Sequence, residues 1–363
     1  MLRLLALAAS ALAGLSPQSS EAFFGRVVAT APAAATHAEL YVGNRRVSRR
    51  RLHGRTIEFA VPAKPGRRDL RIRFERGQQL LRREEALSVW LLPRSATVAK
   101  RARVTDRALA NALAGAGSSF RGYAGLWVHD LATGRTAGWN SETLFPAAST
   151  VKLGVLVAAL GSFGAQPERS TTWRELRDLA IWSSNLASNR LVRRLGGSEA
   201  GGSELVQQTL WRLGAASSTF TGDYRLGTGV ASDTPRPLPI STYRRTTARD
   251  LGTILFQLHA AATGDARALR ATRLTVHQAR LGLALLLSSD GRGENAGLFR
   301  PLRGLPVAQK NGWTMTVQHT AAIVYRKRGP VIVVCLTYAT DNSLERAQRL
   351  GARVAELVDR SGP

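Results

Sequence analysis

The chain of 363 residues has a single cysteine, Cys335, so no disulfide can form within it. Cys335 lies in the apolar run 331–336 and is expected to be a small buried hydrophobic residue. No cysteines and histidines have the spacing of metal ligands. The sequence therefore predicts no metal site, and nothing in it indicates a cofactor. A chain of this length can build hydrophobic cores for two domains.

Acidic residues are scarce, with 25 Asp and Glu against 51 Lys and Arg and a formal net charge of +26. Two interpretations stay open. The excess arginine attracts a polyanion such as nucleic acid or an anionic cell wall, or it reflects genomic base composition, with arginines on solvated surfaces. Aromatic residues make up only 6% of the chain and no nucleic-acid-binding motif occurs. We therefore predict no nucleic-acid partner and keep the anionic cell wall as a candidate.

Long apolar runs near the N-terminus are also missing. The stretch 4–15 follows the positive Arg3 and is too short to cross a bilayer, which takes about 20 residues. With the small residues of Ser20-Glu21-Ala22, residues 1–22 have the pattern of a signal peptide cleaved near Ala22. We therefore predict an exported protein, located outside the cell, in the cell wall or in the periplasm, without a stable membrane span after cleavage.

The pattern changes in residues 23–93. Short stretches of alternating apolar and polar residues, such as 56–62 and 69–74, are separated by turn residues. They predict a small all-β module, for which an immunoglobulin-like assignment lacks the usual cysteine pair. Its expected role is that of a spacer or of a module that binds the wall or a partner. Residues 94–104 are predicted to be a linker.

Residues 105–363 predict an α+β domain, an α/β sandwich. An all-helical block is expected between strands that lie near both ends of the domain, at 122–130, 136–140, 307–310, 320–325 and 331–338. Both groups of strands should join one antiparallel sheet. The helices expected near 105–114 and 343–358 should pack together on one of its faces.

Residues 145–160 organise this domain. Extended Phe145-Pro146 leads into small residues, and an apolar helix is predicted to begin at Ser149 and to lie in the core. Residues three apart share a helix face, so Lys152 can reach the Ser149 hydroxyl. A serine needs a neighbouring base to become a nucleophile, and burial and the positive helix N-terminus lower the pKa of a lysine enough for that task. The alternative is a capping serine followed by a surface lysine.

Two more polar clusters interrupt apolar sequence. In residues 181–189, Ser183 and Asn185 serve either as helix caps at a junction or as groups that point into a cleft. Lys310 stands at the end of an expected strand, and Gly312 follows it. A glycine at that place allows a ligand to approach the backbone closely.

In order and spacing, the three clusters resemble the S-x-x-K, S-D-N and K-T-G motifs of the serine β-lactamase and penicillin-binding protein superfamily, in particular its class A β-lactamase-like branch. They read S-T-V-K at 149–152, S-S-N at 183–185 and K-N-G at 310–312. The helix start at 246–250 also resembles the family. The resemblance covers about residues 105–363 and leaves the N-terminal module outside.

The resemblance implies a reaction through an acyl-enzyme. Ser149 would be the acylated nucleophile, Lys152 the base that activates it, and Ser183 the relay that passes a proton to the leaving nitrogen. The substrate would be a β-lactam or a small molecule like a peptidoglycan stem.

The resemblance also implies substrate-binding groups. Asn185 would hold the side-chain amide of the substrate and Lys310 its carboxylate. The backbone N–H groups of Ser149 and of Trp313, which follows Gly312, would form the oxyanion hole. Further residues could lie near this site: Asn189, Asn311, His319, Asp223 and Asp233.

The sequence departs from the family pattern at three points. Ser184 stands where the family has Asp, and Asn311 where it has Thr or Ser. Class A β-lactamases use a Glu on a loop between the second and third motifs to position the deacylating water, but residues 213–246 contain no Glu. Asp223 and Asp233 are the carboxylates of that stretch, and turn chemistry also explains both. Acylation is therefore expected and deacylation is in doubt.

Three functions follow from these motifs. The first is a β-lactamase-like serine hydrolase with slow turnover, which would act in the response to antibiotics. The second is a penicillin-binding or D-Ala carboxypeptidase-like serine peptidase of the cell wall. The third is a cell-wall-binding protein that keeps the fold without catalysis, against which the intact Ser149, Lys152 and Lys310 argue.

Overall fold

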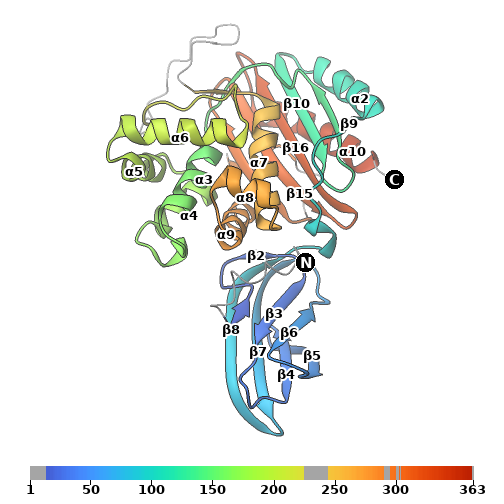
Figure 1. Cartoon of the computed structure of the whole chain (residues 1–363). Helices are drawn as coiled ribbons and strands as arrows, with labels where there is room; N and C mark the ends of the chain where they lie inside the picture. The colour runs from blue at the N-terminus through green and yellow to red at the C-terminus, as the bar shows by residue number, and fades with distance from the viewer. Residues whose placement is uncertain (1–13, 225–243, 290–294, 300–301, 303, 362–363) are drawn as a thin grey trace. The chain divides into compact units, whose positions relative to one another are not determined.

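The computed structural model describes residues 14–224, 244–289, 295–299, 302 and 304–361 (Figure 1). Its contacts divide the chain into two compact units, residues 1–97 and 98–363. The division falls inside the predicted linker 94–104. Within the described residues, no helix combines the length and the apolar character that crossing a bilayer requires.

The first unit is the predicted all-β module and consists of two packed sheets. Their strand orders are β1-β3-β6 and β2-β8-β7-β4-β5. Alternating residues of both sheets, among them Leu40, Phe59 and Phe74, are buried between them. The strands are β1 (Leu15–Ser16), β2 (Ala22–Phe23), β3 (Arg26–Thr30), β4 (His37–Val42), β5 (Arg45–Arg51), β6 (Thr56–Ala60), β7 (Gly66–Arg76) and β8 (Gln79–Leu91).

The start of this unit differs from the prediction. Leu15 pairs with Ala29 in β3, and Ala22 pairs with Trp90 in β8. Leu15 and Ala22 are both buried. Residues 15–22 therefore belong to the folded β unit, so its predicted start at residue 23 is wrong. Cleavage near Ala22 would remove β1 from its sheet, whereas export itself stays a prediction.

The second unit contains the predicted α+β domain. Its six-stranded sheet has the order β14-β15-β16-β10-β11-β9 and is antiparallel except for the parallel pair β11–β9. Strands from both ends of the domain meet where β10 pairs with β16, as predicted. The strands are β9 (Val104–Thr105), β10 (Tyr123–Asp130), β11 (Arg135–Trp139), β14 (Val307–Trp313), β15 (Val317–Arg326) and β16 (Gly329–Tyr338).

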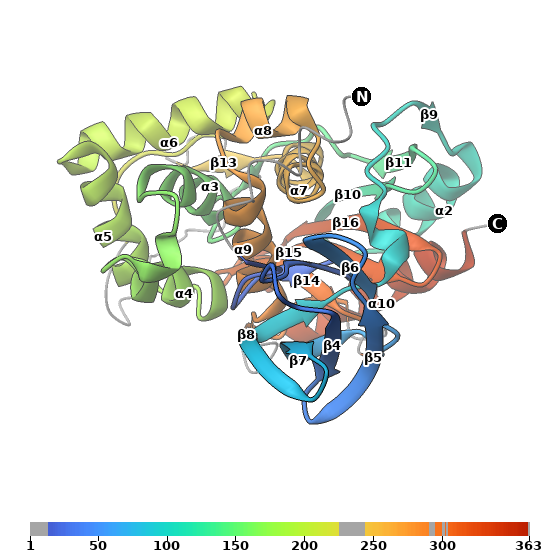
Figure 2. The ribbon, with the colours of Figure 1, turned by 60° about the horizontal axis from the view of Figure 1, so that its bottom comes forward.

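Helices cover both faces of this sheet (Figures 1 and 2). On one face, α2 (Arg107–Ser118) and α10 (Leu344–Arg360) bury a core that includes Cys335, so the prediction for both terminal helices is confirmed. The other face carries the helical block. It comprises α3 (Lys152–Ser162), α4 (Trp173–Ile181), α5 (Asn185–Gly196), α6 (Glu199–Leu213), α7 (Ala248–Ala262), α8 (Ala266–Thr272) and α9 (Val276–Leu287).

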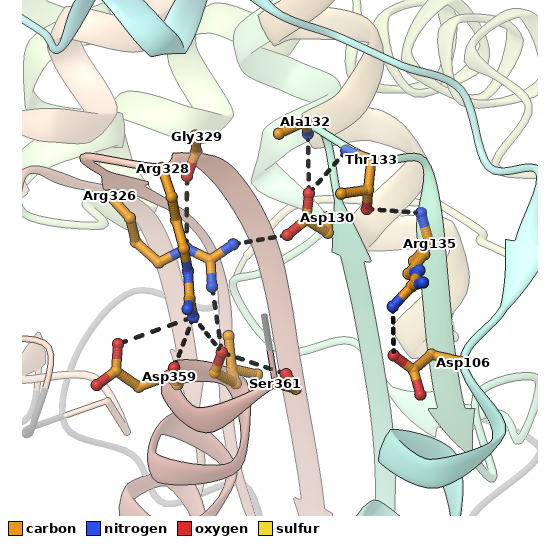
Figure 3. A network of polar contacts seen from close by, with 11 residues as sticks. Asp106, Asp130, Ala132, Thr133, Arg135, Arg326, Arg328, Gly329, Asp359 and Ser361 are labelled. Carbon is orange, nitrogen blue, oxygen red and sulfur yellow. Dashed lines mark hydrogen bonds and ion pairs between the residues drawn. The ribbon is translucent and has the colours of Figure 1, made fainter. Parts of the chain in front are cut away.

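A buried arginine ties the C-terminal helix to the sheet (Figure 3). Arg326 in β15 is only 4% exposed. It donates to the Asp130 carboxylate in β10 at 2.8 Å and to the Val358 carbonyl in α10 at 3.1 Å. A cation near the C-terminal carbonyls complements the helix dipole. This cluster lies at the end of α10 and contains none of the predicted site residues.

Candidate active site

The segment before α3 fixes the place of Ser149. Strand β12 (Phe145–Pro146) pairs with β13 (Arg245–Thr246), and the Ala147 amide donates to the Arg244 carbonyl. Ser149 lies in the turn that follows, and α3 begins at Lys152, three residues later than predicted. The first backbone hydrogen bonds of this turn join residues three positions apart, and one of them runs from the Lys152 amide to the Ser149 carbonyl at 3.3 Å. The chain thus enters the helix through a tightened turn, which is common at helix ends.

Lys152 is fully buried and joins the first motif to the second. Its amine donates to the Ser183 carbonyl at 2.7 Å and to Asn185 Oδ1 at 2.6 Å. These are the hydrogen bonds that Lys152 Nζ makes among the described residues. The Ser149 hydroxyl is not a partner in either of them. A neutral amine has two N–H groups and one lone pair. With both N–H groups directed at the second motif, the lone pair of a neutral Lys152 remains available to accept a proton.

The second motif forms the junction between α4 and α5. Ser183 adopts φ of +58°, a left-handed conformation that is uncommon for a residue other than glycine. Ser184 caps α5 by accepting from the Ala187 amide at 3.2 Å. Ser184 is thus a helix cap, while the Ser183 carbonyl and the Asn185 side chain accept from Lys152. A serine is sufficient for the cap, which explains how the Asp of the family pattern can be absent.

The third motif lies on β14, at the edge of the sheet. Lys310 is buried, and its amine donates to the Ser183 hydroxyl at 2.7 Å and to the Asn311 carbonyl at 2.9 Å. A Cβ atom at Gly312 would lie 2.8 Å from the Ser149 nitrogen and 2.9 Å from that of Thr150. The glycine is thus required because β14 runs directly against the turn that carries Ser149. The structure brings all three motifs together.

The site is rich in basic residues, and its two lysines are buried. Burial lowers the pKa of Lys152 well below its usual range, and the positive charges of Lys310 and Arg244 lower it further. Burial also lowers the pKa of Lys310 to about 7. In the described part of the chain, neither lysine forms an ion pair with a carboxylate. These are the conditions in which a lysine can act as a base near neutral pH.

The ring of Tyr224 packs against the Lys152 amine. The centre of its ring lies 4.2 Å from Lys152 Nζ, and its hydroxyl donates to the Ala148 carbonyl at 3.2 Å. The Asn189 side chain fixes the Tyr224 backbone, since it donates to the carbonyl at 2.7 Å and accepts from the amide at 2.8 Å. The guanidinium of Arg244 stacks on the same ring at 3.9 Å.

Sequence reasoning missed Tyr224 and Arg244 because it searched the stretch 213–246 for carboxylates. An available signal was Asn189, which the resemblance had placed near the site without a partner. Its amide is buried, and a buried amide requires a partner to donate to and one to accept from. Tyr224 supplies both. Asn189 is therefore a positioning residue for the segment that faces Lys152.

The comparisons with known proteins agree with this geometry. The profile of the family described as "Beta-lactamase enzyme family" matches residues 106–166 and 161–360, which is more than half of the chain. The chain belongs to this family. The match confirms the family that the three motifs indicated. A search of curated protein sequences gave no significant match.

Solved structures of the family share the fold of the second unit. PBP-A matches at a TM-score of 0.53 and 17% identity, over 72% of this chain and all of PBP-A. A β-lactamase from Desulfarculus baarsii matches at 0.53 and 21%, over 70% of this chain and 98% of its own. One from Streptosporangium roseum matches at 0.54 and 20%, over 70% and 99%. At these identities the likeness shows the fold alone.

Of the two carboxylates considered for deacylation, Asp223 has partners away from the family site. Asp223 forms an ion pair with Arg193 on α5, and its amide binds Glu199. Its carboxylate is thereby directed to the arginine, and no contact joins it to Lys152 or Ser149 within the described residues. Asp233 lies outside the described residues.

Asn311 and His319 have structural partners. The Asn311 side chain donates to the Asn295 carbonyl at 2.9 Å and accepts from the Thr320 hydroxyl at 2.7 Å, whereas Lys310 points to the opposite face of β14. His319 is 2% exposed. Its Nε2 lies 2.8 Å from the Pro146 carbonyl, and its Nδ1 accepts from the Thr337 amide at 3.1 Å. His319 therefore anchors the strand before Ser149.

Proposed function

We propose that this protein is a serine acyl-enzyme of the penicillin-binding type, which opens β-lactams and cleaves related D-Ala amides through Ser149. The observation that best supports the proposal is the set of contacts around the Lys152 amine. The amine is buried against Ser183 and Asn185, and the ring of Tyr224 covers it on the side of the 213–246 stretch.

The acylation step follows from these contacts. The Ser149 hydroxyl transfers its proton to neutral Lys152 as its oxygen attacks the carbonyl carbon of the substrate. The C–N bond breaks, and the leaving nitrogen takes a proton from the Ser183 hydroxyl, which Lys310 replenishes. The Ser149 and Trp313 amides would stabilise the oxyanion. Lys310 and Asn185 would hold the carboxylate and the amide of the substrate.

For deacylation, no carboxylate among the described residues contacts Lys152 as a base would. The face of Tyr224 stabilises the Lys152 ammonium that acylation produces, but a phenol whose pKa burial raises is no base for a water molecule. General-base help contributes roughly 10²–10⁴ in rate, so we expect a long-lived β-lactam adduct. The family structures include a complex described as an acyl-enzyme of a PBP-A mutant with penicillin G, which supports this type of intermediate.

The test is mass spectrometry of the full chain mixed with penicillin G and sampled from seconds to hours. We expect one adduct per chain that persists for minutes to hours and is absent in Ser149→Ala. Rapid consumption of penicillin without a trapped adduct would instead establish a β-lactamase with another base. Neither adduct nor consumption would favour the cell-wall-binding function without catalysis. The predicted export fits a substrate in the cell envelope and remains a prediction.

A further inference from the structure

The outer face of the larger sheet in the β unit is covered with arginines. Pairing of β4 with β5 and β7 places alternate residues of these strands on the side away from the core. In the adjoining part of β8, the pairing with β7 places Arg83 and Glu85 on the same side of the sheet. We call this surface the arginine face. Its arginines are Arg46, Arg49, Arg51, Arg71, Arg73 and Arg83, and its carboxylates are Glu39, Glu75 and Glu85.

Two buried carboxylates hold these arginines in place from below. Glu39 is 3% exposed and accepts from Arg46 at 2.7 Å and from the Tyr41 hydroxyl at 2.7 Å. Glu75 is 7% exposed and lies 3.2 Å from Arg73. Arg49 lies between both carboxylates, at 3.6 and 3.7 Å. The guanidinium groups of Arg46, Arg49 and Arg73 are thus already held in place and lose little conformational entropy when an external anion binds.

The same groups stay open to solvent above the sheet. The side chains of Arg46, Arg49 and Arg83 are 53%, 47% and 51% exposed. Each guanidinium has five N–H donors, more than the carboxylates below can use. The remaining donors face outward on a flat surface, where they match oxyanions.

The register contains an unfavourable pair that an anion would relieve. Arg73 in β7 stands directly opposite Arg83 in β8, and like charges in cross-strand pairs are destabilising. Glu75 and Glu85 offset part of this repulsion, since each binds one of the two arginines. An anion placed between Arg73 and Arg83 would bind both.

The shape and charge of this face decide what kind of partner fits. A single exposed ion pair contributes less than about 1 kcal/mol, so useful affinity on a flat surface requires many contacts with one polymer. Within β4, β5 and β7 the outward aromatic residue is Tyr41, and the Arg71 guanidinium lies over its ring at 5.1 Å. The guanidinium occupies one face of this ring, which disfavours the stacking of nucleic-acid bases there.

We propose that the arginine face binds a linear phosphodiester polymer without bases, of the poly(glycerol phosphate) kind found in cell envelopes. The polymer crosses the strands, and successive phosphates meet arginines on neighbouring strands. The β unit thereby attaches the enzyme to an anionic matrix. This inference is independent of the reaction at Ser149.

The test measures binding of the full chain to fluorescently labelled poly(glycerol phosphate) as salt is raised. The variant Arg46→Gln/Arg73→Gln/Arg83→Gln should bind at least about tenfold more weakly at low salt, and its salt slope should be lower by about 0.7–0.9 for each phosphate that it no longer neutralises. A second variant, Arg51→Gln/Arg83→Gln, leaves the partners of Glu39 and Glu75 intact and should show the same trend with an unchanged circular dichroism spectrum.

The matched control removes the same charge elsewhere, at the exposed Arg267, Arg270 and Arg353 of the second unit. It should bind like the wild type. Equal losses in the control would mean that net charge alone attracts the polymer and would overturn the inference. Absence of binding by the wild type would overturn it too. Tighter binding of a single-stranded oligonucleotide with equal charge would exclude a polymer without bases.

Discussion

At the scale of single residues, we expect Tyr224 to set the lifetime of the proposed adduct. We predict that Tyr224→Glu shortens the penicillin adduct by about 10- to 100-fold, because it places a general base beside Lys152 and Ser149. Tyr224→Phe should leave the lifetime within about threefold, since it keeps the ring over Lys152. Mass spectrometry of both acylated variants measures the two lifetimes. Equal lifetimes in both would show that Tyr224 does not occupy the path of the deacylating water.

Lys310 gives the site a pH dependence. Burial lowers its pKa to about 7, so the charge that meets a substrate carboxylate is present below pH 7 and lost above it. The second-order rate constant of acylation should therefore fall as pH rises through 7 in the free enzyme. Lys310→Arg keeps its charge at every working pH and should abolish this alkaline decline. Stopped-flow acylation with a chromogenic cephalosporin at pH 5–9 provides the measurement.

At the scale of elements, the contact between β14 and the turn before α3 keeps the motifs together. Gly312→Ala would place its Cβ 2.8 Å from the Ser149 nitrogen, so one of the two segments must move. We expect acylation to slow by about 100-fold, because small displacements of reacting groups cost that much. Gly115→Ala in α2, where a Cβ meets no atom within 4 Å, is the control and should acylate normally. Normal acylation by Gly312→Ala would refute this account.

Much of the fold could be predicted from the sequence at this scale. Alternating residues and turn signals identified most strands, and Asp106 and Thr247 cap α2 and α7 as expected of capping residues. The long β8 was missed because its charged middle, 82–85, has no apolar alternation. The N-terminal boundary was misplaced because the small residues of 20–22, which suit a cleavage site, also fit the start of a strand, where Ala22 pairs with Trp90.

The candidate site was predictable to a different degree. The motifs placed Ser149, Lys152, Ser183 and Lys310, and the structure brings them together. Their partners could not be derived, since the bonds from Lys152 to Asn185 and from Asn189 to Tyr224 join residues more than 30 positions apart. Such contacts depend on the packing of whole helices. Local sequence carries no information about it.

At the scale of the whole molecule, the stability of the fold depends on two hydrophobic cores and on titratable groups of the second unit. The β unit and the α+β unit each have a hydrophobic core of their own. Two of the buried histidines of the second unit are His129 and His319, and burial lowers the pKa of each to about 4 from the usual 6.5. Each ring binds a backbone carbonyl, of Lys100 and Pro146 respectively.

These histidines predict how stability changes with pH. Above pH 6.5 the rings are neutral in the folded and the unfolded state and contribute no pH dependence. Between pH 6.5 and 4 the unfolded state binds more protons, so the free energy of unfolding decreases as the solution is acidified. The full effect is about 3 kcal/mol for each histidine. Below pH 4 both states are protonated and this contribution becomes constant.

Urea unfolding at pH 4–7.5, followed by tryptophan fluorescence, measures this slope, since all tryptophans except Trp90 lie in the second unit. His319→Gln should reduce the slope by about half, because one of the two titrating rings is removed. His53→Gln, at an exposed position of the β unit, should leave it unchanged. If His319→Gln keeps the full slope, His319 is not one of the groups that make the second unit sensitive to acid.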